Sequence, residues 1–155
     1  MKINRDVPRM QNHSSNKLEL KIESRTDRLI FVRNFVSGAA RKFGFSDEEV
    51  SNIALAVDEA CTNVIKHAYR FATDQEINIT ILMRDGKFEV VITDKGRHFN
   101  PERVKIANMK EYLKQYNRRG FGMYLMKSLV DKVEYTIKPG RKNVVRLIKF
   151  LRQGN

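Results

Sequence analysis

The stretch DEACTNVIKHAY, residues 58–69, places three polar side chains four residues apart, at Glu59, Asn63 and His67. Because an α-helix turns once in 3.6 residues, this spacing puts them on one stripe of a helix, along the border of its apolar face. The small residues Ala56 and Ala60 beside the stripe leave room for a ligand. From this helix alone, a solvated face with ordinary salt-bridge partners explains the pattern equally well.

The helix that carries this stripe is predicted to begin after Ser46. Ser46 and Glu49 form the sequence signature of a capping box, and two further acids in the first turn suit the helix dipole. Apolar residues then recur at helical spacing, at Val50, Ile53, Val57, Ala60 and Val64. The sequence therefore predicts an amphipathic helix that packs on a core and extends to Tyr69 or Arg70.

Alternation of apolar and polar residues predicts five strands. They are residues 17–23, 76–84, 87–94, 132–138 and 143–151. Asp85-Gly86 and Pro139-Gly140 are the turn signals of two hairpins. Helical patterns predict two more helices, one with Ser24 as its N-cap and its end near Phe43, and one over 121–131.

The predicted order of elements is β-α-α-β-β-loop-α-β-β. This order predicts an α+β fold, a two-layer sandwich with the helices on one face of a mixed, largely antiparallel sheet. Alternating β-α-β units are missing, so a doubly wound nucleotide-binding fold is excluded. A chain of 155 residues has room for one domain. We assign residues 17–155 to that domain and residues 1–16, which are polar and aperiodic, to a flexible N-terminal tail.

The composition is basic, with 30 Lys and Arg residues against 18 Asp and Glu and a formal net charge of +12. This balance fits nucleic acid, an acidic partner or a phosphate-bearing ligand, and a solvated basic surface is the simplest interpretation because the cations form no single tract. Cys61 is the only cysteine, which excludes an internal disulfide. Neither a run of ~20 apolar residues nor a secretory signal is present, so the sequence predicts a cytoplasmic protein.

Two further motifs contain glycines. Asp94-Lys95-Gly96 follows a strand and presents a carboxylate where the backbone can approach a ligand closely, although Asp and Gly are also ordinary turn residues. RRGFGM, residues 118–123, opens a helix whose N-terminus favours an anion. The connection between them, at about 96–119, is long and basic, and we predict a lid with one short helical piece at 103–115. The motif G-x-x-x-x-G-K-[ST] is absent, which excludes a P-loop.

Taken in order, these motifs resemble the three boxes of the Bergerat-fold superfamily, which includes the gyrase, heat-shock chaperone, histidine-kinase and mismatch-repair ATPases. DEACTNVIKHAY is similar to the first box, TDKGRHFNP to the second and RRGFGMYLMKSLVD to the third. Within the superfamily, the chain resembles the anti-sigma-factor serine kinases of stress response and sporulation over residues 17–151.

The resemblance implies roles for individual residues. Asn63 is expected to coordinate a Mg²⁺ ion that bridges the phosphates of ATP, and Glu59 to act as general base toward an acceptor hydroxyl. Asp94 is expected to accept a hydrogen bond from the adenine amino group, with the ring lying against Gly96. Other residues are implied to contact the nucleotide: Lys66, His67, Phe99, Arg118, Arg119, Gly120, Phe121, Gly122 and Met123. For His67, a structural hydrogen bond is an equal alternative.

The chain departs from the family pattern at two positions. His98, followed by Phe99, stands where the second box of the superfamily often has another glycine. Val144 aligns with a threonine that often lies near the adenine, so one water-mediated contact with the base is expected to be missing. Neither change removes a phosphate ligand.

The function implied by the resemblance is that of an ATP- and Mg²⁺-dependent anti-sigma factor. Such a protein binds a sigma factor and phosphorylates a serine or threonine of an antagonist protein, an arrangement called partner switching. A homodimer is implied by family likeness alone. Two alternatives remain open, a non-catalytic ATP-binding regulatory module and a basic nucleic-acid-binding protein. The second is disfavoured because no helix-turn-helix pattern, zinc motif or aromatic-rich sheet signature is present.

Overall fold

The computed structural model describes residues 10–14, 16–97, 121–138 and 142–152. Six strands form one sheet, in the order β1-β2-β3-β4-β6-β5. Their bounds are β1 Met10–Ser14, β2 Lys17–Glu23, β3 Glu76–Arg84, β4 Lys87–Asp94, β5 Lys132–Lys138 and β6 Lys142–Phe150. Every pairing between these strands is antiparallel, so the described sheet is not mixed as predicted.

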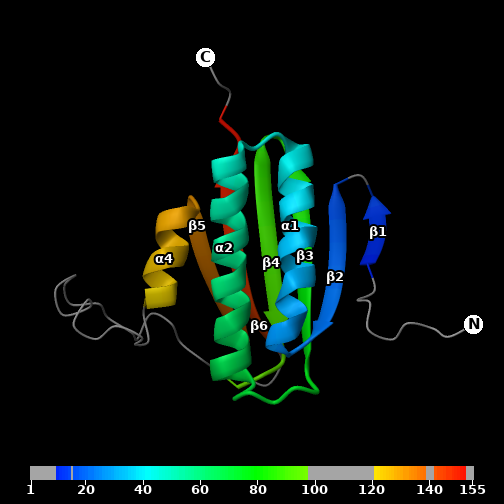
Figure 1. The fold of residues 1–155 in the computed structure, drawn as a ribbon, viewed down its shortest axis with the longest axis vertical. Helices are drawn as coiled ribbons and strands as arrows, with labels where there is room; N and C mark the ends of the chain where they lie inside the picture. Colours follow the sequence, from blue (N-terminus) through cyan, green and yellow to red (C-terminus); the bar gives the residue numbers. More distant parts are fainter. Residues whose placement is uncertain (1–9, 15, 98–120, 139–141, 153–155) are drawn as a thin grey trace, which may run out of the picture.

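Three α-helices cover one face of this sheet, as Figure 1 shows. They are α1 Leu29–Phe43, α2 Asp47–Asn63 and α4 Phe121–Leu129. The 3-10 turn η1, Thr26–Arg28, precedes α1, and the π-helix η2, Val64–Ala68, continues α2. The predicted two-layer α+β sandwich, with its helices on one face, is therefore confirmed. None of the helices in the described ranges is long and apolar enough to cross a membrane.

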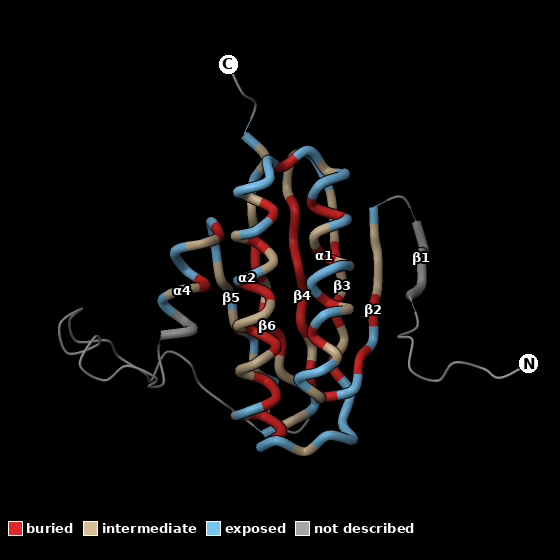
Figure 2. The backbone as a smooth tube through the Cα atoms, viewed as in Figure 1, coloured by how far each residue is buried: buried red, intermediate tan, exposed pale blue. Residues whose placement is uncertain are grey.

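The core lies between the two layers, where Figure 2 shows the central strands and the inner sides of α1 and α2 as buried. Alternate residues of β3 and β4 point into it because successive side chains of a strand face opposite sides of the sheet. Ile77, Ile79, Ile81, Phe88, Val90 and Ile92 are fully buried there. This alternation fixes the register, and it brings Asp94 opposite Asn143 at one end of the sheet.

The capping box that begins α2 is confirmed. Ser46 Oγ accepts a hydrogen bond from the backbone N–H of Glu49 at 3.2 Å, and Glu49 Oε1 accepts one from the backbone N–H of Ser46 at 3.3 Å. The predicted end of this helix near Tyr69 is also correct, but its last five residues form a π-helix rather than an α-helix. Helices with such insertions are frequent at functional sites.

The prediction that Ser24 caps the first helix is wrong. Ser24 is fully buried, and its hydroxyl donates to the carbonyl of Ala72 and accepts from the backbone N–H of Gln75. The side chain thus connects the end of β2 with the loop before β3. A serine ahead of a helical pattern satisfies the rule for an N-cap, but here long-range partners 48 and 51 residues away determine its hydrogen bonds.

Part of the predicted flexible tail is also a strand. β1 pairs antiparallel with β2, and the register between them shifts at Asn12/Ser14. The segment, MQNHS, lacks the apolar alternation that identified the other strands. Residues 98–119 of the predicted lid, including its helical piece at 103–115, lie outside the described residues.

Candidate nucleotide-binding site

A pocket lies between the end of α2 and the strands β4, β6 and β5. Its empty volume, counting the part that is open to solvent, is about 430 Å³. The residues that line it are Ala60, Asn63, Val64, Ala68, Asp94, Tyr135, Ile137, Asn143, Val144 and Val145. The polar side chains of Asn63, Asp94 and Asn143 thus share a largely apolar cavity. The predicted stripe of α2 and the predicted Asp-x-Gly turn meet there.

Asp94 is the buried carboxylate of this pocket, with 5% of its surface exposed. Its Oδ1 atom accepts hydrogen bonds from the backbone N–H of Gly96 at 2.8 Å and from Asn143 Nδ2 at 2.9 Å. Burial raises the pKa of the carboxyl, while these two hydrogen bonds act in the opposite direction. Both hydrogen bonds from the described residues reach Oδ1, which leaves Oδ2 without a partner among them.

Asn143, on β6, was not identified from the sequence. Besides Asp94, its Nδ2 atom lies 3.1 Å from the carbonyl oxygen of Gly96 and 3.3 Å from that of Arg97. It therefore holds both the carboxylate and the backbone of the turn that follows β4. The pairing of β4 with β6 is the signal that identifies it, because Asn143 lies directly opposite Asp94. Val144, where a family threonine was expected, lies one residue further and pairs with Thr93.

Gly96 packs directly on the end of the π-helix. A Cβ atom at this position would lie 2.7 Å from the carbonyl oxygen of Ala68 and 2.8 Å from its Cβ atom. The backbone N–H of Arg97 donates to the same carbonyl at 2.8 Å. Because backbone atoms cannot move away as a flexible side chain can, only glycine fits here. The close approach joins the Asp-x-Gly turn to the helix that carries Asn63.

Tyr69 holds the same turn from the other side. Its hydroxyl donates to the carbonyl of Glu76 at 2.6 Å and accepts from the backbone N–H of Lys95 at 2.9 Å. Burial is the main reason that the pKa of this tyrosine is raised, so the hydroxyl stays protonated and can donate. The tyrosine of the HAY sequence is thus a positioning residue for the turn, a role that the sequence did not reveal.

The fit of Gly96 against Ala68 gives a first testable prediction. Gly96→Ala is expected to lower the free energy of unfolding by about 1–3 kcal/mol, because a methyl group would have to displace backbone atoms. It is also expected to weaken nucleotide binding, since the turn that holds Asp94 must shift. Urea denaturation and nucleotide titration of the same preparation measure the two effects.

Gly38→Ala is the matched control for this substitution. A Cβ atom at Gly38, within α1, meets no atom within 4 Å, and alanine favours a helix by roughly 0.5–1 kcal/mol over glycine. We expect unchanged nucleotide binding and equal or higher stability. A Gly96→Ala protein as stable as the Gly38→Ala protein, with wild-type nucleotide affinity, would show that the close contact has no importance.

One residue of the polar stripe of α2 lines the pocket. Asn63 is half-buried and lines the pocket, and Glu59, one turn earlier, is also half-buried. Burial raises the pKa of the Glu59 carboxyl, the charge of Asp58 adds to this, and Lys66 opposes it. A carboxylate with a raised pKa is a stronger base, which suits proton abstraction. Lys66 is exposed and His67 half-buried, and both lie on the π-helix.

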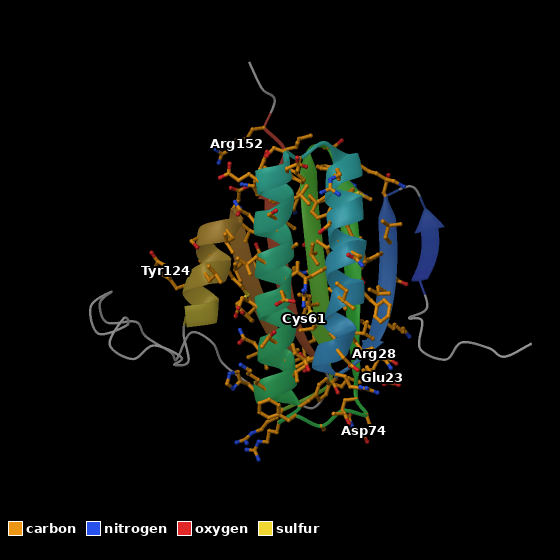
Figure 3. All side chains as sticks on the ribbon, in the orientation of Figure 1. Glu23, Arg28, Cys61, Asp74, Tyr124 and Arg152 are labelled. Carbon is orange, nitrogen blue, oxygen red and sulfur yellow. The ribbon has the colours of Figure 1, made fainter. Side chains whose placement is uncertain are left out.

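The small residues beside the stripe have different environments. Ala60 lines the pocket, as expected, whereas Ala56 is fully buried and does not. Cys61 is fully buried in the lower half of α2 (Figure 3). Burial, aided by the charge of Asp58, raises the pKa of its thiol, so this cysteine is a core residue rather than a nucleophile.

The third box begins helix α4, which packs against α2. Phe121, Gly122 and Met123 begin this helix, and Met126 further along it is fully buried. Four further predicted site residues lie outside the described residues, namely Phe99, Arg118, Arg119 and Gly120. His98 lies outside them as well. The nucleotide contacts implied for Phe99, Arg118, Arg119 and Gly120 stay predictions.

Helices on one face of an antiparallel sheet, with a buried aspartate between the end of α2 and the central strands, define a Bergerat-type ATP-binding domain. A model of the histidine kinase-like ATPase domain matches residues 22–149. The serine-protein kinase RsbW of Bacillus pumilus is 31% identical over 147 residues, which are 90% of this chain and 89% of that protein. The chain belongs to the histidine kinase-like ATPase domain family and, within it, to the RsbW serine-protein kinases.

Two solved structures have the same fold. The first contains the RsbU and RsbW domains of Rv1364c from Mycobacterium tuberculosis, with a TM-score of 0.61 and 17% identity over 88% of this chain and 33% of that one. The second is the SiaB-SiaC complex from Pseudomonas aeruginosa, with a TM-score of 0.63 and 11% identity over 84% of this chain and 87% of the other. At these identities the likeness concerns the fold alone.

Proposed function

We propose that this chain is an ATP- and Mg²⁺-dependent serine/threonine kinase that binds a sigma factor and phosphorylates an antagonist protein in the cytoplasm. The observation that carries the proposal is the pocket in which the buried Asp94, held by Gly96 and Asn143, faces the same cavity as Asn63. Membership of a family of serine-protein kinases supports the protein hydroxyl as acceptor.

Asp94 selects the base in this proposal. Its Oδ1 atom is occupied by two donors, so Oδ2 is available to accept from an exocyclic amino group. Adenine carries such a donor, and guanine has a carbonyl oxygen at the equivalent ring position. An unpaired acceptor in a buried site is costly, so the carboxylate favours adenine over guanine.

The base selectivity gives a second prediction. Asp94→Asn is expected to weaken ATP binding at least roughly tenfold, since a hydrogen bond to a charged group contributes about 1.5–3 kcal/mol. The asparagine retains an oxygen for Gly96 and Asn143, so the melting temperature should change little. Asp74→Asn, an exposed aspartate at the same end of the molecule (Figure 3), is the control. Titrations with ATP and GTP give the answer, and equal affinities of the wild-type protein for both would rule out this role.

Asn63 suits a magnesium site. Mg²⁺ prefers oxygen ligands, keeps several waters, and is held by few protein groups together with substrate phosphates. Asn63, whose side chain carries an amide oxygen, lines the pocket, and the described residues contain no cluster of three or more acids, histidines or cysteines that would form an all-protein cage. Asn63 therefore fits a Mg²⁺ ion that takes its other ligands from the phosphates of ATP and from water. When bound, Mg²⁺ neutralises charge on the phosphate oxygens.

Glu59 is the general base. It lies one helical turn before Asn63, and thus on the side of Asn63 away from Asp94 and the base. Glu59 removes the proton of the serine or threonine hydroxyl, whose oxygen forms a bond to the γ-phosphorus of ATP. The bond from that phosphorus to the β,γ-bridging oxygen breaks, and ADP leaves. Removal of the proton by a positioned carboxylate contributes about 10²–10⁴ in rate.

Phosphorylation would then change which partner stays bound. A phosphoryl group adds about −1.5 to −2 charges to the surface of the antagonist, and burying this charge at a docked interface carries a desolvation cost. A chain with a net charge of +12 suits an acidic partner. We therefore expect that the sigma factor and the unphosphorylated antagonist compete for this protein.

Capture of partners from the native cytoplasm tests this proposal. The full chain, loaded with ATP in one sample and with ADP in another, is expected to retain a sigma factor and a small antagonist protein, with a balance that depends on the nucleotide. A non-catalytic module would retain partners without phosphorylating them. Capture of nucleic acid in place of both proteins would favour the alternative of a basic nucleic-acid-binding protein.

A further inference from the structure

Tyr135 lines the pocket from β5, an edge strand of the sheet, and the proposed nucleotide contacts do not use its hydroxyl. Its side chain lies on the inner face of the sheet, because Tyr135 pairs with the buried Val145 and packs against the core. Its neighbours on the strand, Glu134 and Thr136, are exposed on the other face. Since α4 lies beside β5 (Figure 1), the tyrosine forms a wall of the pocket on the side of α4.

The hydroxyl of Tyr135 is available to a ligand. It forms no hydrogen bond with any residue that the structure describes, whereas the hydroxyl of Tyr69 forms two. It is not enclosed by protein atoms either, since Oδ1 of Asn78 is the only enclosed side-chain oxygen or nitrogen without a partner among the described residues. Burial raises the pKa of Tyr135, so the hydroxyl stays protonated and can donate. A tyrosine hydroxyl in such a position usually finds a partner.

The pocket thus presents three polar groups to a ligand. They are Oδ2 of Asp94, the amide of Asn63 and the hydroxyl of Tyr135, and within the described part of the chain the Asn63 amide also forms no hydrogen bond. A nucleotide has three polar parts, namely the base, the sugar and the phosphates. The proposed function assigns the base to Asp94 and the phosphates with their metal to Asn63, which leaves the sugar for Tyr135.

The register of the sheet gives the separation between Asp94 and Tyr135. Asp94 pairs with Asn143, and Asn143 pairs with Ile137, so these three residues form one row across β4, β6 and β5. Tyr135 lies two residues from Ile137, in the next inward-facing row. With strands about 4.8 Å apart and about 3.4 Å per residue, the Cα atoms of Asp94 and Tyr135 are about 12 Å apart.

This separation favours the sugar over the base as the partner of Tyr135. The exocyclic amino group of adenine and the sugar are attached at opposite ends of the purine. A base that is held by its amino group at Asp94 therefore reaches Tyr135 only with its sugar end. Between the two polar groups the lining is apolar, with Ala60, Val64 and Val145. No polar side chain of the lining thus competes for the hydroxyl along this path.

We propose that the hydroxyl of Tyr135 donates a hydrogen bond to a ribose hydroxyl of ATP and makes Tyr135 a specificity-determining residue for ribonucleotides over deoxyribonucleotides. This inference rests on the proposed function, which places the base and the phosphates. A site built to bind a hydroxyl discriminates against a ligand that lacks it, because a protein group then loses its partner.

Nucleotide titration of the full chain and of Tyr135→Phe tests the inference. The probes are ATP, 2′-deoxy-ATP and 3′-deoxy-ATP. Tyr135→Phe is expected to weaken ATP binding by about 3- to 10-fold, the range for one neutral hydrogen bond. At least one of the deoxynucleotides should bind the wild-type protein more weakly by a similar factor. Tyr135→Phe should bind that deoxynucleotide and ATP within about twofold of each other, because both partners of the hydrogen bond are then already lost.

Two controls separate this contact from other effects. Tyr124→Phe removes the hydroxyl of an exposed tyrosine that points outward from α4 (Figure 3) and is expected to leave the affinity for ATP unchanged. Adenosine has the ribose but no phosphates, so Tyr135→Phe should weaken adenosine binding by the same factor as ATP binding. Phenylalanine retains the ring of Tyr135, and the melting temperature should change little.

Several results would overturn the ribose contact and leave the proposed kinase intact. They are wild-type affinity of Tyr135→Phe for ATP, an equal loss in Tyr124→Phe, and an undiminished effect of Tyr135→Phe on both deoxynucleotides. An effect that disappears with adenosine would assign the hydroxyl to the phosphates and overturn the contact as well. A wild-type protein that binds no ATP would contradict both the proposed function and this inference. The predicted affinities in a protein that transfers no phosphate would support the ribose contact and contradict only the kinase.

Discussion

Glu59→Gln is expected to reduce phosphoryl transfer to the antagonist by about 10²–10⁴-fold while ATP affinity stays within a few-fold of wild type. Glutamine keeps the size and hydrogen-bonding ability of the side chain and loses only the base. Glu59 is half-buried, its pKa is raised by burial and by Asp58, and it does not line the pocket that holds Asp94. Its contribution should therefore appear in the rate and hardly in binding.

The measurement for this variant is transfer of labelled γ-phosphate beside nucleotide titration of the same preparation. Glu48→Gln, an exposed acid in the first turn of α2, removes the same charge from the same helix and is expected to leave both quantities unchanged. Should Glu59→Gln transfer phosphate as fast as wild type, Glu59 is not the base of the kinase.

Asn63→Ala is expected to weaken binding of ATP in the presence of Mg²⁺ by roughly 10- to 100-fold, the range for loss of an interaction with charged groups. Asn63 lines the pocket from α2 and faces the wall that carries Asp94, so it is placed to reach the metal and phosphates of a nucleotide whose base lies at Asp94. The effect should shrink when Mg²⁺ is removed, because the wild-type protein then loses the same contact.

Isothermal titration with and without Mg²⁺ measures this prediction. Asn52→Ala, three turns earlier on the same helix, is the matched control because Asn52 lies outside the pocket. Unchanged affinity of Asn63→Ala for ATP would remove this helix from the nucleotide site.

Local signals predicted most of the fold. The capping box at Ser46, the alternation in the strands and the Asp85-Gly86 turn each depend on a few neighbouring residues, and all three are present as predicted. Ser24 was not predicted correctly because its hydrogen-bond partners are distant in sequence, whereas β1 was missed although it pairs with the next strand along the chain. Ser24 is bound to the loop at Ala72 and Gln75, and β1 has one neighbouring strand and no apolar alternation.

In the site, too, residues with a local sequence signal were predicted and residues that depend on strand pairing were not. The sequence identified Asn63 and Asp94, and the structure brings them to one pocket. It did not identify Asn143, because an asparagine near a turn is common and its importance depends on the register between β4 and β6. The π-helix at the end of α2 was also missed. Its sequence continues the helical pattern, and the wider turn is recognised only by its hydrogen bonds, such as Tyr69 N–H to the carbonyl of Val64 at 2.9 Å.

Transfer of the γ-phosphate of ATP to the antagonist protein tests the central claim most directly. Wild-type protein, labelled ATP, Mg²⁺ and the co-purified antagonist are mixed, and the phosphorylated residue is located by mass spectrometry. The proposed kinase predicts label on a serine or threonine of the antagonist, lost in Glu59→Gln and in Asn63→Ala and absent without Mg²⁺. If the wild-type protein binds ATP in an Asn63-dependent manner but labels no protein that it retains, the chain is a non-catalytic ATP-binding module and the claim is contradicted.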